Sequence, residues 1–148
     1  CLWCYPDDYI DVAVGLVGAE RVNRFYPVAS IARTGGRLVG GSDWDVSSLN
    51  PLDAIETAVT RQNPYTNAGR VLGSGENVDL QLALDMYTRN AARVMRLDAL
   101  TGSIEVGKRA DLIVLDRDLF SIPIHEVNEA RILQTLLDGA EVYTDRSF

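Results

Sequence analysis

The chain is poor in the residues that build metal and redox centres. Its 148 residues include two cysteines and one histidine. It also has no GxSxG, P-loop or HExxH motif, so the hydrolases and nucleotide-binding proteins built on those motifs are not indicated. Because a zinc centre needs about three protein ligands, we expect these residues to supply at most one ligand of a metal site.

Long apolar runs and blocks of cations are missing as well. No stretch approaches the ~20 apolar residues that span a bilayer. Thirteen arginines and Lys108 are scattered along a chain of net charge −7, whereas nucleic-acid binding needs cations lined up against phosphates. We therefore expect no membrane and no nucleic-acid partner. Hydrophobic residues at 47 % and charged residues at 24 % indicate a globular chain. We also expect it to be cytoplasmic.

The two cysteines, Cys1 and Cys4, form a lone CxxC pair. As a zinc half-site the pair lacks two ligands, and as a redox pair it lacks a following helix that would lower a thiol pKa. We interpret both as structural cysteines, with a redox pair or an amino-terminal nucleophile as alternatives. Since the chain begins without Met and in apolar residues, we expect it to be part of a longer protein.

Apolar residues at helical spacing predict a largely helical first two thirds. The predicted helices cover 9–17, 19–26, 28–33, 51–59 and 79–95. Expected N-caps are Asp7 or Asp8, Asn50 before Pro51, and Asp79. Thr88 or Asn90 is expected to break the last helix into two.

The remainder of the chain predicts a loop and several strands. Residues 62–77 are rich in Asn, Pro, Gly and Ser, which is typical of a long irregular loop. A β-type run covers 110–115. A hairpin is expected over 136–144, with Asp138 and Gly139 as its tight turn.

The most informative segment is 37–44. Leu38 and Val39 follow a glycine pair, which predicts a short, buried parallel strand. Two glycines, Ser42 and Asp43 come at its carboxyl end, where catalytic groups collect in α/β proteins. A carboxylate there can bind a metal and accept a proton. Asp43 is therefore the candidate catalytic residue and metal ligand, and a turn cap is the alternative.

The other polar candidates are interpreted as structural. His125 is alone, and a metal site wants several ligands, so we expect a surface or capping residue. Three carboxylate pairs occupy positions where helix caps or solvated faces are expected: Asp7 with Asp8, Asp53 with Glu56, and Asp116 with Asp118.

Several motifs in order resemble metal-dependent amidohydrolases, particularly the YtcJ-like branch. Residues 41–51, GSDWDVSSLNP, are similar to the last barrel strand and its loop. Residues 87–92 are similar to the TxNAA helix of that branch. The run 102–116, GSIEVGKRADLIVLD, closely matches the superfamily signature in which a Gly-Lys turn leads into a β-sandwich strand. The series covers the chain from about Tyr5 to Tyr143.

This resemblance implies an α/β fold: the carboxyl-terminal part of a (β/α)8 TIM barrel over 1–100, with strand eight at about 37–43, and strands of the appended small β-sandwich over 101–148. It implies hydrolysis of C–N bonds in small-molecule amides or cyclic amides at a divalent metal, with zinc as the expected metal. Asp43 would be the metal ligand and base. Arg61 would be a substrate-binding or structural residue near the barrel mouth, and Lys108 and Asp111 would be structural.

The family's other metal ligands, which lie upstream in its members, are absent from this sequence. Asp45 also stands where the branch usually has Pro. We therefore expect a fragment that holds no cofactor and is inactive by itself, with the missing amino-terminal barrel portion as its partner. Exposed strand edges predict self-association. The alternatives are a non-catalytic interaction or regulatory module, and a redox or metal module on Cys1 and Cys4.

Overall fold

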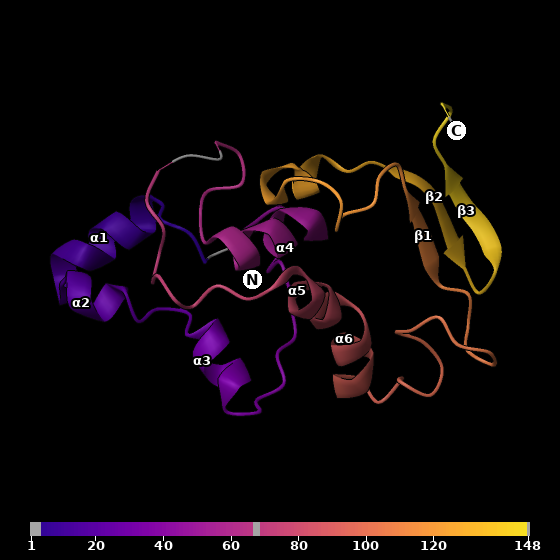
Figure 1. Ribbon diagram of the computed structural model, residues 1–148, viewed down its shortest axis with the longest axis horizontal. Helices are drawn as coiled ribbons and strands as arrows, with labels where there is room; N and C mark the ends of the chain where they lie inside the picture. The colour runs from indigo at the N-terminus through magenta and orange to yellow at the C-terminus, as the bar shows by residue number, and fades with distance from the viewer. Residues whose placement is uncertain (1–3, 67–68, 148) are drawn as a thin grey trace.

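The computed structural model describes residues 4–66 and 69–147. Helices form the first two thirds of the chain, and a three-stranded antiparallel sheet follows at the carboxyl-terminal end (Figure 1). None of the helices in these two ranges is long and apolar enough to cross a membrane.

The elements have the following bounds. The helices are α1 (Asp8–Val17), α2 (Ala19–Val22), α3 (Val28–Arg33), α4 (Pro51–Thr60), α5 (Leu80–Tyr87), α6 (Arg89–Val94) and the 3-10 helix η1 (Ile124–Glu129). The strands are β1 (Leu112–Leu115), β2 (Ile132–Leu137) and β3 (Ala140–Thr144), paired in the order β1-β2-β3.

Side-chain caps begin three of the helices, as predicted. Asp7 Oδ1 accepts the N–H of Ile10 at 2.8 Å at the start of α1. Asn50 and Asp79 cap α4 and α5 by accepting backbone N–H groups at 3.1 and 2.7 Å. Each cap satisfies a donor that the first helical turn leaves free. Thr88 separates α5 from α6, which confirms the predicted break.

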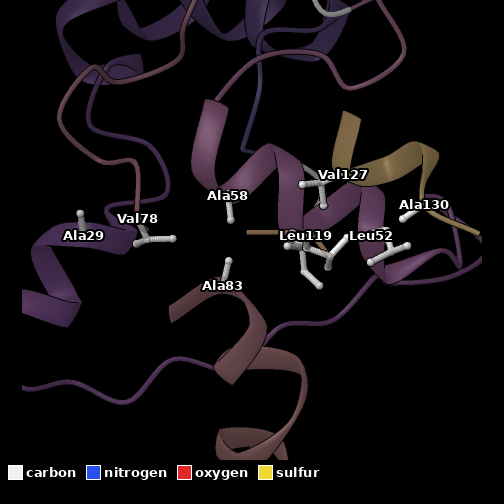
Figure 2. Packing of buried hydrophobic residues seen from close by; sticks show 9 residues of the cluster. Ala29, Leu52, Ala58, Val78, Ala83, Leu119, Val127 and Ala130 are labelled. Atoms are coloured by element: carbon white, nitrogen blue, oxygen red, sulfur yellow. The ribbon is translucent and has the colours of Figure 1, made fainter. Parts of the chain in front are cut away.

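Helix α4 is the central element, and it is buried on all sides. Every residue from Leu52 to Ala58 is buried, because η1 and α5 both pack against the helix. Figure 2 shows Ala58 of α4 pointing toward Ala83 of α5, with Val127 of η1 beside the same helix. Helix caps or a solvated face were expected for Asp53 and Glu56, and the solvated face is wrong, because both residues are buried. Glu56 lies against Asn128 of η1, and Asp53 accepts hydrogen bonds from Asn50 and Tyr65.

Arg61 follows α4 and joins it to two distant segments. Its backbone is left-handed, with φ of 58°, and its side chain is 0 % exposed. Nε donates to the carbonyl of Leu72 at 2.8 Å. Nη1 and Nη2 donate to the carbonyls of Tyr26 and Phe25 at 3.1 and 3.0 Å. The prediction of a helix to residue 26 is wrong: α2 ends at Val22, and the carbonyls of Phe25 and Tyr26 accept hydrogen bonds from Arg61.

Gly73 allows the loop after Arg61 to come this close. Its φ is +60°, and a Cβ there would lie 2.7 Å from the carbonyl oxygen of Asn23 and 3.2 Å from Nη2 of Arg61. A side chain would therefore meet both backbone and guanidinium, in a conformation that favours glycine.

The hairpin between β2 and β3 has the predicted turn. Asp138 and Gly139 both have positive φ, 52° and 79°, which suits a two-residue hairpin loop. Asp111 holds this turn, since its Oδ1 accepts the Asp138 N–H at 2.8 Å. Its Oδ2 accepts the Thr101 hydroxyl at 3.0 Å. These bonds agree with the structural role expected for Asp111.

Residues 36–43 have no regular secondary structure and do not form the predicted strand. Gly40 N–H donates to the carbonyl of Met86 at 3.0 Å, and Asn90 Nδ2 donates to the carbonyl of Leu38 at 3.1 Å. Val39 is 41 % exposed, so the expected full burial is also wrong. A parallel strand needs hydrogen-bonded neighbouring strands, and the sheet of the described chain lies apart from this segment (Figure 1).

Leu52→Ala is expected to lower the free energy of unfolding by about 2–5 kcal/mol, because it leaves a cavity in the core around α4. Urea unfolding followed by circular dichroism measures the change. Leu52 is 5 % exposed, whereas Leu49 is 66 % exposed, so Leu49→Ala is the matched control and should cost less than about 0.5 kcal/mol. Equal losses in the two variants would contradict the α4-centred core.

Arg61→Lys is expected to lower the free energy of unfolding by about 2–4 kcal/mol. A single ammonium group cannot reproduce the guanidinium fork, and each buried carbonyl left without a donor costs ~1–3 kcal/mol. Arg70→Lys is the control, because Arg70 forms an exposed ion pair with Asp11 and should change stability by less than about 1 kcal/mol. A well-tolerated Arg61→Lys would show that the three carbonyls do not depend on this side chain.

Candidate functional site

Asp43 ends the segment 36–43 and directly precedes the loop 44–50. Its φ is 54°, and its backbone carbonyl accepts the N–H of Val46 at 2.8 Å. The side chain is exposed, and its carboxylate has no hydrogen-bond or ion-pair partner among residues 4–66 and 69–147. The turn is thus closed by the backbone of Asp43, and the carboxylate does not cap it. The carboxylate is available to a ligand.

Hydrogen bonds between nearby residues hold the loop that joins Asp43 to α4. Ser42 Oγ accepts the N–H of Trp44 at 3.2 Å, and the Ser47 hydroxyl donates to the carbonyl of Ser42. Ser48 Oγ then accepts the N–H of Asn50 at 3.1 Å, directly before the N-cap bond of α4. The loop is therefore held by its own serines.

Helices α5 and α6 hold the other end of the segment that carries Asp43. The Asn90 amide bonds to Leu38, and a Cβ at Gly40 would lie 2.2 Å from the ring of Tyr87. Glycine is therefore required where the ring crosses the segment. Burial raises the pKa of Tyr87 to about 12, so its phenol stays neutral. Tyr87 and Asn90 are part of the motif similar to TxNAA, and the structure brings them against the segment that leads to Asp43.

Arg61, the second candidate, presents no group to solvent. Its three nitrogens donate to backbone carbonyls, and the side chain is fully buried. Of the two roles considered for Arg61, this geometry supports the structural one.

The described residues do not form a complete metal centre. In the ranges 4–66 and 69–147, no three or more His, Cys, Asp or Glu side chains lie together so that they could hold an ion. His125 is half-buried in η1. Asp43 supplies a single carboxylate, whereas a zinc site requires about three protein ligands.

Cys4 is a buried thiol, and Cys1 lies outside the described residues. Burial raises the pKa of the Cys4 thiol, although the nearby Arg61 opposes this shift. A thiol held in its protonated form is a poor nucleophile and metal ligand. This environment supports a structural role for Cys4.

Sequence reasoning did not identify another buried ionisable group, the Glu56 carboxyl on α4. It lies under η1, some 70 positions further along the chain, where its Oε2 accepts the N–H of Asn128. Asp53 and Glu56 interrupt the apolar spacing of α4 as solvent-facing residues do. A signal that η1 would cover Glu56 is absent from the local pattern, because that contact is long-range.

The chain is similar to one protein family and to several known proteins. The model of the amidohydrolase family matches residues 4–143. An N-substituted formamide deformylase of Arthrobacter pascens is 38 % identical over 120 residues, which are 81 % of this chain and 22 % of that protein. The amidohydrolase YtcJ of Bacillus subtilis is 27 % identical over 127 residues, 86 % of this chain and 24 % of that protein.

A solved structure has a similar fold. The amidohydrolase from Thermotoga maritima superposes with a TM-score of 0.56 and 23 % identity, over 80 % of this chain and 26 % of that one. At this identity the likeness shows a shared fold. The chain spans about a quarter of the length of the relatives it matches. The resemblance based on the ordered motifs is confirmed, and since the family model covers nearly all of its residues, the chain belongs to the amidohydrolase family.

Proposed function

We propose that the chain is the carboxyl-terminal part of a metal-dependent amidohydrolase that hydrolyses C–N bonds in small-molecule amides or cyclic amides. The observation that carries this proposal is the exposed, unpaired carboxylate of Asp43 at the end of a segment anchored by α5 and α6. Family membership supports it, as does the C–N bond that a formamide deformylase breaks.

In this proposal Asp43 contributes one metal ligand and the general base. Its carboxylate accepts a proton from water as the water oxygen adds to the amide carbon. The C–N bond then breaks, and the proton passes to the departing nitrogen. A bound divalent metal would polarise the water and the carbonyl, and its other ligands would lie outside this chain, because the described residues do not suffice to hold it.

The remaining residues of the site have supporting roles. Ser42 and Ser47 hold the loop, and Asn90 and Tyr87 hold the segment before it. Arg61 is assigned a structural role at the end of α4. Residues 37–43 would become strand eight of the barrel when neighbouring strands are supplied, and β1–β3 would join the small β-sandwich.

A hybrid enzyme tests this assignment. The chain replaces the matching carboxyl-terminal part of the Arthrobacter deformylase, and hydrolysis of an N-substituted formamide is measured with chelator and after zinc is restored. We expect zinc-dependent hydrolysis, which Asp43→Asn lowers by ~100- to 10,000-fold because the base is lost. Asp45→Asn, at an exposed carboxylate on the same loop, is the control and should stay near the parent rate.

The hybrid experiment also separates the alternative functions. A hybrid that is active with Asn at position 43 would contradict the role of Asp43. The 148-residue chain alone is expected to be inactive. A non-catalytic interaction module would instead bind its partner equally well with and without Asp43→Asn.

Exposed apolar side chains support the proposal that further chain covers this fragment. Ile104, Val106, Ile113, Val142 and Tyr143 are all exposed in or before the sheet. Because such surface is costly in water, the isolated chain is expected to self-associate. Sedimentation velocity should show a mass above the 16.3 kDa of one chain, rising with concentration. A monomer that binds no apolar dye would contradict this expectation, and Ile113→Lys should reduce the association.

A further inference from the structure

The contact between α4 and η1 contains a carboxyl group that is only half satisfied. Glu56 is 0 % exposed. Its Oε2 accepts the backbone N–H of Asn128 at 3.0 Å. Its Oε1 is buried without a hydrogen-bond partner. A buried acceptor without a donor is rare in folded proteins. We therefore expect a group that could donate a hydrogen to, or share one with, Glu56 Oε1.

Asn128 has a complementary deficit. Its Nδ2 donates to the carbonyl of Pro64 at 2.8 Å, which orients the side-chain amide. Its Oδ1 is buried and has no donor. Glu56 and Asn128 are therefore joined by one hydrogen bond while each retains one acceptor oxygen without a donor.

The surroundings disfavour a negative charge on Glu56. Burial raises the pKa of Glu56; the Asn128 N–H lowers it, and Asp53 of α4 and Glu129 of η1 raise it further. The other titratable groups of η1 are His125 and Glu126. Glu126 and Glu129 both raise the pKa of Arg117. On α5 the charged residue is Asp85, which pairs with Arg89. No lysine or arginine of the described ranges forms an ion pair with Glu56.

We infer that Glu56 takes up a proton on Oε1 and donates it to Oδ1 of Asn128, which makes the α4–η1 contact a proton-dependent clamp. A single proton from solvent supplies the donor that both oxygens lack. It also removes the charge from a fully buried carboxyl. The clamp links α4, which follows the loop of Asp43, to η1, which leads into β2. It stands independently of the proposed function.

The clamp predicts a definite direction for the pH dependence of stability. The folded chain holds the Glu56 proton more tightly than the unfolded chain, in which a glutamate has a pKa of about 4.3. The clamp's contribution is fully present below that value. It is lost as the pH rises through the raised pKa of Glu56, and then stays constant. Each pKa unit between the two states corresponds to a tenfold change in the unfolding constant.

Glu56→Gln tests the clamp. The glutamine amide can donate permanently to Asn128 Oδ1 while its carbonyl still accepts the Asn128 N–H, so the variant imitates the protonated state. Urea unfolding of both proteins is measured from about pH 4 to pH 9, a range that starts near the ordinary pKa of glutamate. We expect the unfolding constant of the parent, relative to the variant, to rise about tenfold per pH unit through the window and then level off.

Asp53→Asn is the matched control, because Asp53 is a buried carboxyl on the same helix whose oxygens already have partners in Asn50 and Tyr65. Because it removes a neighbouring carboxylate that raises the pKa of Glu56, it should narrow the pH range of the parent's effect while keeping its direction. A Gln variant with the same pH dependence as the parent, or one less stable at every pH, would overturn the clamp.

Carbon-13 NMR of the Glu56 carboxyl in the unsubstituted chain tests the protonation of Glu56 directly, even where a variant fails to fold. We expect the Glu56 carboxyl to titrate above the ordinary glutamate pKa. Titration at or below the ordinary value would overturn the proposal. A second result would also overturn the proposal: an ionised Glu56 in a chain whose stability rises with added potassium or sodium. A bound cation, and not a proton, would then compensate the buried carboxylate.

Discussion

The buried guanidinium of Arg61 is the interaction on which the arrangement of the amino-terminal half depends. Placing a cation out of water is costly unless its hydrogen bonds are satisfied. Arg61 meets this requirement with three backbone carbonyls from two segments, near the buried thiol of Cys4. Two of these carbonyls belong to the chain that follows α2, and glycine at position 73 lets the loop approach. One side chain thus positions α4 against the chain on either side of it.

Helix α4 connects this interaction to the candidate site. Asn50 caps its start, directly after the loop of Asp43, and Arg61 anchors its end. Between them Glu56 meets η1 and Ala58 meets α5. A helix held at both ends and covered on every side gives the loop before it a rigid base. That suits a carboxylate whose position relative to other groups determines its chemistry.

The sequence identified Asp43 as a candidate site residue and left the role of Arg61 open. Asp43 was identified because it follows a short apolar run and two glycines, and because the surrounding motifs resemble amidohydrolases. The structure adds that the carboxylate is exposed and that Asn90 and Tyr87 hold the segment before it. The role of Arg61 could not be chosen from the sequence, since a guanidinium serves equally to bind a substrate or to bind carbonyls. Its complete burial supports the second use.

The sequence by itself determined the features that depend on neighbouring residues: the caps at Asp7, Asn50 and Asp79, the break at Thr88, and the turn at Asp138 and Gly139. Each rests on bonds or backbone preferences within a few positions. Tertiary structure alone decided the burial of Glu56 and Arg61 and the absence of a strand at 37–43. Burial depends on which distant segment covers a side chain, and a strand exists only when another strand pairs with it.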